Sequence, residues 1–182
     1  MIKLLIFLLL IIPSVCFADG LVLGWPAAGG SGFVGNENGS VDSVATGSAI
    51  DQGFESCYSA ATTGNVTYIH AKTDMETGSN AAIYSSDRTT KLGDGTMTSS
   101  SAGQINVQLD SPVSITQGTT YCLVVGSHVD DYYEMSVTNL VGNPVRIMDP
   151  FTIGDTMPAS YTAGSINQEF YGLIIWADDS AT

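Results

Sequence analysis

The chain has 182 residues, with eighteen acidic residues against five basic ones and a formal net charge of −13. It lacks the clustered lysines and arginines that neutralise phosphates, which excludes nucleic acid as a partner and disfavours anionic membrane surfaces. Hydrophobic residues make up 44% of the chain and occur in patterned runs, which excludes intrinsic disorder. We attribute the acidity to solubility of a chain rich in strand-forming residues.

Residues 1–18 are predicted to be a cleavable signal peptide. Lys3 provides a positive start, an apolar run spans Leu4 to Ile12, and Ala18 is a small residue at the expected cleavage point. The run is shorter than the roughly 20 residues of a transmembrane helix, so no stable membrane span is expected after cleavage. A lipoprotein acylated at Cys16 is the minor alternative. The chain is therefore predicted to be secreted or displayed at the cell surface, with a periplasmic location left open.

Residues 19–182 are predicted to form one all-β domain, which begins with an irregular Gly-rich segment over 19–50 that holds one or two short strands. Further on, apolar and polar residues alternate in short runs between turn residues, as in half-buried antiparallel strands. We expect an antiparallel β-sandwich or jelly roll of about eight to ten strands, with essentially no helix outside the signal peptide. Beyond the Gly-rich segment, strands are predicted in residues 53–60, 66–71, 81–84, 105–109, 121–125, 132–140, 145–148 and 170–176.

Some boundaries are predicted from glycine and proline. Residues 85–95 contain Gly93 and Gly95 and are predicted to be a long turn. Pro112 is predicted to end the strand over residues 105–109. Gln117-Gly118 predicts a turn that leads into residues 121–125. That run is apolar on both faces, which favours a central strand covered on each side.

After signal cleavage, Cys57 and Cys122 are the remaining cysteines. An exported chain with two cysteines is expected to pair them, with two buried thiols as the alternative. The bridge would close a loop of about 65 residues, for which chain entropy suggests roughly 4 kcal/mol of stabilisation. Neither cysteine has the neighbours of a nucleophile or of a zinc site, so their role is predicted to be structural.

The middle of the chain carries A-A-I-Y, K-L-G, S-P-V and I-T-Q-G-T-T-Y-C-L-V-V in that order. Over about Val66 to Gly126 this resembles secreted bacterial jelly-roll β-sandwich domains, in which a segment like "aaIYsd…lLG" precedes "pv.l.aGttYwLav". Such domains occur in exported surface, filament-associated and carbohydrate-active proteins, often without catalysis. The resemblance implies structural roles for Gly118 and Tyr121 and no functional residue. Where those domains commonly place an aromatic residue, this chain has Cys122.

Catalysis has little support in the sequence. The histidines are His70, expected to pack within a strand, and His128, and no G-x-S-x-G elbow occurs. The acid pairs Asp130-Asp131 and Asp74 with Glu76 could act on a glycosidic bond, but adjacent acids on a loop are usually solvated. We therefore expect no enzyme.

A carbohydrate-binding module is the alternative function, because sugar rings stack on exposed aromatic side chains. The candidate aromatics are Trp25, Tyr132, Tyr133, Tyr161 and Trp176. These side chains could instead pack in the core. In an alternating strand one of Tyr132 and Tyr133 must face inward, and Trp176 ends an apolar strand. Calcium held by Asp130, Asp131 and Glu134 could support such a site, and no other cofactor is expected.

The competing function is structural. The segment Asp19 to Val34 could be donated as an edge strand to a neighbour, or it could be a plain flexible terminus. We predict an exported non-catalytic β-sandwich with a structural, adhesive or filament-assembly role, ahead of carbohydrate binding and of a glycan-active enzyme. Its partners would be copies of itself, other surface proteins or glycans.

Overall fold

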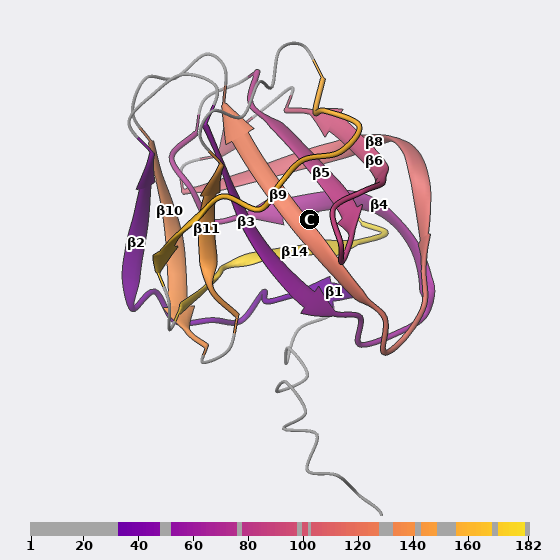
Figure 1. The fold of residues 1–182 in the computed structure, drawn as a ribbon, viewed down its shortest axis with the longest axis horizontal. Helices are drawn as coiled ribbons and strands as arrows, with labels where there is room; N and C mark the ends of the chain where they lie inside the picture. Colours follow the sequence, from indigo (N-terminus) through magenta and orange to yellow (C-terminus); the bar gives the residue numbers. More distant parts are fainter. Residues whose placement is uncertain are drawn as a thin grey trace, which may run out of the picture.

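The computed structural model describes residues 33–47, 52–75, 78–97, 100–101, 103–127, 133–140, 143–148, 156–168 and 171–180. These residues form an antiparallel β-sandwich without any helix, which confirms the predicted fold class (Figure 1). In the same residues no helix is long and apolar enough to cross a membrane. The predicted signal peptide and the Gly-rich residues before Phe33 lie outside this part of the chain.

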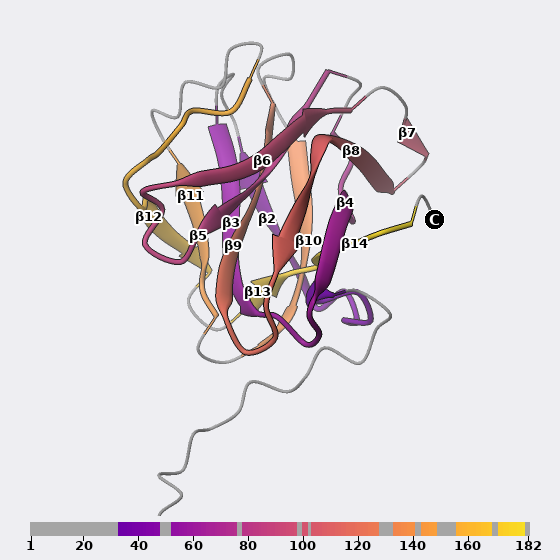
Figure 2. The same cartoon turned by 90° about the vertical axis from the view of Figure 1, so that its right-hand side faces the viewer.

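Two layers face each other (Figure 2). One layer is a six-stranded sheet in the order β12 (Ser165–Gln168), β11 (Val145–Met148), β3 (Gln52–Ser59), β9 (Thr120–Ser127), β5 (Asn80–Ser85) and β6 (Lys91–Thr96). The facing layer holds a five-stranded sheet in the order β1 (Val34–Gly35), β14 (Ile175–Asp178), β4 (Gly64–Ala71), β8 (Gln104–Ile115) and β7 (Ser100–Ser101). Beside it lies a three-stranded sheet in the order β13 (Tyr171–Leu173), β10 (Tyr133–Asn139) and β2 (Ser43–Gly47). Eight of the fourteen strands in the described residues have five residues or more, and among the shorter ones β11 has the predicted bounds 145–148.

The core lies between the layers and follows from period-two alternation along each strand. In β3, Phe54 and Tyr58 face inward, whereas Glu55 and Cys57 face outward. The other strands alternate in the same way and fill one continuous cluster. Its fully buried larger members include Phe54, Ile69, Ile83, Ile105, Ile115, Leu123 and Met135.

The predicted strand over 170–176 is two strands with different partners. β13 pairs with β10, β14 pairs with β4, and the break falls at Ile174. At this break Ser56 Oγ accepts a hydrogen bond from Leu173 N at 3.2 Å, and the Tyr58 hydroxyl donates one to Leu173 O. Buried polar side chains of the facing sheet thus satisfy the backbone where the strand changes partners.

The predicted long turn over 85–95 is wrong, because β6 begins at Lys91. Gly93 and Gly95 are strand residues at which β6 approaches β8 closely. A Cβ at Gly95 would lie 2.0 Å from Gln108 O, and one at Gly93 would lie 2.4 Å from Val113 Cγ2. Both glycines therefore mark a contact between two strands and not a turn.

The predicted strand end at Pro112 is also wrong, because β8 continues to Ile115. Between β4 and β8 the register jumps: Val66 lies opposite Val113, and Tyr68 lies opposite Gln108. Residues 109–112 therefore bulge out of the ladder, where a proline costs no ladder hydrogen bond.

Candidate functional site

The outer face of the six-stranded sheet is crossed by residues 156–164, which we call the strap (Figure 1). Backbone and side chains hold it to the sheet. The Tyr84 hydroxyl donates to Pro158 O at 2.8 Å, and Lys91 Nζ donates to Met157 O at 2.7 Å. The strap covers a small apolar cluster on this face, formed by Ala82, Tyr84, Cys122, Val124 and Met157. The prediction that residues 121–125 form a central strand covered on both faces is confirmed.

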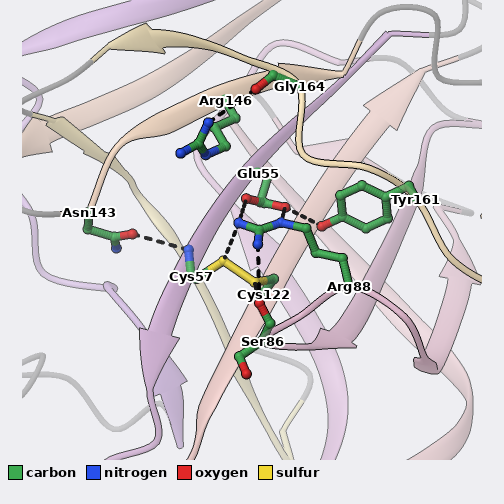
Figure 3. Close-up of polar contacts among 9 residues, drawn as sticks. All are labelled: Glu55, Cys57, Ser86, Arg88, Cys122, Asn143, Arg146, Tyr161 and Gly164. Atoms are coloured by element: carbon green, nitrogen blue, oxygen red, sulfur yellow. Dashed lines mark hydrogen bonds and ion pairs between the residues drawn. A yellow bond between two sulfur atoms is a disulfide. The ribbon is translucent and has the colours of Figure 1, made fainter.

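A buried carboxylate lies beside this apolar cluster (Figure 3). Glu55 is 1% exposed, and the Arg88 guanidinium binds it through two nitrogens, Nε at 2.6 Å and Nη2 at 2.5 Å. The Tyr161 hydroxyl of the strap donates to the same carboxylate. Both carboxylate oxygens are therefore occupied, and the two-nitrogen geometry is the strong form of this ion pair. The hydrogen bonds to Glu55 raise the pKa of the Arg88 guanidinium.

Arg88 occupies an unusual backbone position. Its φ is +64°, in the left-handed region that costs a non-glycine residue about 1 kcal/mol or more. The turn is supported locally, since the Asp87 carboxylate accepts hydrogen bonds from the Ser85 hydroxyl and from Thr89 N. The Ser85 hydrogen bond is the main reason that the pKa of Asp87 lies below its usual range. This turn aims Arg88 inward over the sheet.

The disulfide between Cys57 and Cys122 is confirmed. The two residues are Cα partners on β3 and β9, so the bridge joins neighbouring strands of one sheet. Arg88 Nη2 lies 3.4 Å from Cys57 Sγ. Glu55 and the two sulfurs converge within 4.8 Å, but sulfurs in a disulfide offer no thiolate to a metal ion.

A pocket of about 180 Å³ opens next to the disulfide. It lies where β3, β9 and β11 meet the turn that carries Arg88 (Figure 3). Its lining residues are Glu55, Cys57, Ser59, Arg88, Thr120, Asn143, Pro144 and Arg146. None of these was predicted as a binding residue. One feature of the sequence could have pointed to this pocket: the chain has only five lysines and arginines. Three of them, Arg88, Lys91 and Arg146, lie on this side of the sandwich.

A second polar cluster lies within the facing layer. His70 is fully buried, and its ring nitrogens lie 2.7 Å from Asn106 Oδ1 and 3.1 Å from Asp178 Oδ1. The ring stacks on Trp176, with centroids 5.0 Å apart. His70 therefore packs, as expected for a residue in mid-strand. Trp176 is 3% exposed and stacks on His70, on the face of β14 opposite to its core neighbours Ile175 and Ala177, so burial disfavours the predicted ligand-binding role of its ring.

The other predicted site residues do not converge in the described structure. Tyr161 lies in the strap, edge-on to Tyr84 at 4.6 Å. Glu134 is on β10, where its backbone nitrogen donates to Asp74 Oδ1 at 2.6 Å. Six further predicted residues lie outside the described part of the chain: Trp25, Glu76, His128, Asp130, Asp131 and Tyr132. The side chain of Tyr133 is also outside it. Calcium binding therefore stays a prediction.

The fold and this site define a disulfide-bonded antiparallel β-sandwich with a buried ion pair beneath a strap. Compared with models of known protein families and with curated protein sequences, the chain matches none of them.

Alkaline pH is expected to destabilise the protein. Burial raises the pKa of Tyr58, Tyr84 and Tyr161, and the charge of Glu55 adds to the effect on the last of them. Above the ordinary tyrosine pKa of 10.0 the unfolded chain releases these protons while the folded chain keeps them. The free energy of unfolding should then fall by about 1.4 kcal/mol per pH unit for each tyrosine.

Urea unfolding at neutral pH and at a series of alkaline pH values would measure this slope. Tyr161→Phe should remove one tyrosine's share of it. A total tyrosinate absorbance that shows all eight tyrosines of the chain ionised before unfolding would contradict the expectation.

Proposed function

We propose that this chain is an exported, non-catalytic β-sandwich protein that has a structural or adhesive role at the cell surface and assembles through its sheet edges. The disulfide fits an oxidising compartment, which the predicted signal peptide would reach. The buried carboxylate and the buried histidine, the groups best suited to acid-base chemistry in the described residues, are both engaged in internal hydrogen bonds.

The observation that carries the proposal is that three of the four exposed large apolar side chains in the described residues lie on edge strands, while the fourth, Val41, precedes β2. Leu92 on β6 is 39% exposed, Ile166 on β12 is 48% exposed and Val44 on β2 is 37% exposed. All three strands are at the edge of their sheets. Edge strands of monomers usually carry charges or prolines that prevent pairing with another chain. β12 and β2 carry neither, and on β6 the charges of Lys91 and Asp94 pair with each other. Exposed apolar side chains on such edges favour addition of a strand from a neighbour.

Light scattering coupled to size exclusion, with negative-stain imaging of the same fractions, tests assembly. We expect concentration-dependent multimers of the unmodified protein and monomers of the triple variant Leu92→Lys, Ile166→Lys, Val44→Lys. Ser111→Lys is the matched control, because it adds positive charge at an exposed position in the β8 bulge and leaves those edges unchanged. A monomer at every concentration, or equal behaviour of the variants, would exclude assembly through these edges.

A further inference from the structure

The pocket beside the disulfide carries two guanidinium groups against one carboxylate, and that carboxylate is already paired. Its single carboxylate, Glu55, has both oxygens bound by Arg88 and Tyr161. Arg146 is the Cα partner of Glu55 across β3 and β11, so both side chains leave the same face of the sheet. No ion pair joins Arg146 to Glu55 or to another acid in the described residues.

Arg146 is held in place by one contact. Its Nη1 donates to Gly164 O in the strap at 3.2 Å, and the described part of the chain gives it no other partner. A guanidinium carries five N–H donors in a planar fork. Four of them are therefore available on a half-buried side chain whose direction the strap sets (Figure 3).

Further donors surround this guanidinium. Ser59 and Thr120 are Cα partners on β3 and β9 and line the pocket with hydroxyls that have no partner in the described residues. Asn143 also lines the pocket, but it offers no donor there: its Oδ1 accepts from Cys57 N at 3.1 Å, and its buried Nδ2 lies beside Gly172 without an acceptor in the described residues. The hydroxyls can donate or accept, but the guanidinium of Arg146 can only donate, so a ligand that binds it must present an acceptor.

The charge and the volume of the pocket limit which acceptor fits. Two guanidinium groups and one carboxylate leave a single positive charge, which a monoanion neutralises and a phosphate dianion would exceed. The 180 Å³ volume is below the roughly 300–1,000 Å³ of pockets for whole small molecules, so it admits an end group. The fork of Arg146 matches the two oxygens of a carboxylate. We propose that this pocket binds a carboxylate group, either of a small free acid or at the uronic-acid end of a glycan.

Titration of the full folded protein with sodium glucuronate, followed by NMR, tests the proposal. We expect saturable shifts of the Arg146 Nε–Hε resonance and of the Ser59 and Thr120 amides, with much smaller shifts for glucose. Sodium acetate distinguishes the sources: binding of both acids points to the carboxylate alone, and binding of glucuronate alone points to a sugar acid. Either result supports the site.

Variants locate the binding. Arg146→Gln should weaken glucuronate binding about tenfold or more, because it removes a charge-assisted pair of hydrogen bonds. Lys72→Gln removes one positive charge from the facing layer and should leave affinity unchanged. Thr120→Val, at an exposed position, should weaken binding several-fold and serves as the second test if Arg146→Gln does not fold. No saturable shift, equal shifts with glucose, tighter binding of inorganic phosphate, or equal losses in the Arg146 and Lys72 variants would overturn the proposal.

Discussion

Arg88→Met should lower the free energy of unfolding by about 3–5 kcal/mol, because it leaves the buried Glu55 carboxylate without its counter-ion. Arg88 itself is partly exposed, with 20% of its side chain accessible, so most of the loss arises from Glu55, which is 1% accessible as a side chain. Methionine is similar in length and meets the same backbone strain at a φ of +64°, so the substitution isolates the charge. Equilibrium urea denaturation would measure the loss.

Two further variants separate the ion pair from general packing. Adding Glu55→Gln to Arg88→Met removes both charges and retains an acceptor for the Tyr161 hydroxyl, so it should restore most of the lost stability. Arg88→Lys retains the charge without the two-nitrogen contact and should fall between the unmodified protein and Arg88→Met. A loss below about 1 kcal/mol in Arg88→Met would place this pair with ordinary surface ion pairs.

Replacing both Cys57 and Cys122 with alanine should destabilise the protein by more than about 4 kcal/mol, which is the contribution expected from closing a loop of 65 residues in the unfolded chain. Cys122 is fully buried in the cluster beneath the strap, so its truncation also opens a cavity there. Urea denaturation of the variant against the oxidised protein gives the total loss.

The reduced unmodified protein is the matched control for that variant. It retains both sulfur atoms and lacks the covalent bond, so it reports the effect of the crosslink without the cavity. We expect it to lie between the oxidised protein and the double alanine variant. Equal stability of oxidised and reduced protein would show that the bridge contributes nothing to folding.

Much of the strand pattern could be predicted because alternation is a local property. Phe54 and Tyr58 lie on one face of their strand whichever strand pairs with it, and the same holds for Leu123 and Val125. All four side chains are in the observed core. The pairing of Cys57 with Cys122 was predictable from the number of cysteines that remain once the predicted signal peptide is removed. That the bridge joins neighbouring strands was not, because strand order depends on contacts far apart in the sequence.

The wrong predictions concern glycine and proline residues whose role depends on contacts with another strand. Glycine commonly marks a turn, but Gly95 lies where a neighbouring backbone leaves no room for a Cβ. Proline commonly ends a strand, but Pro112 lies in a bulge that needs no ladder hydrogen bond. In both cases the deciding neighbour belongs to another strand, which local sequence does not reveal.

The sequence by itself determined the all-β class, most of the longer strands and the paired cysteines, since alternation and cysteine count require no knowledge of strand order. The tertiary structure alone decided the site. Glu55, Arg88 and Arg146 are far apart in the chain and carry no motif, and they meet only because β3 and β11 are neighbours and the turn after β5 folds over them. Burial increases the effect of these charges on stability, because a carboxylate removed from water is destabilising unless it is paired and hydrogen-bonded.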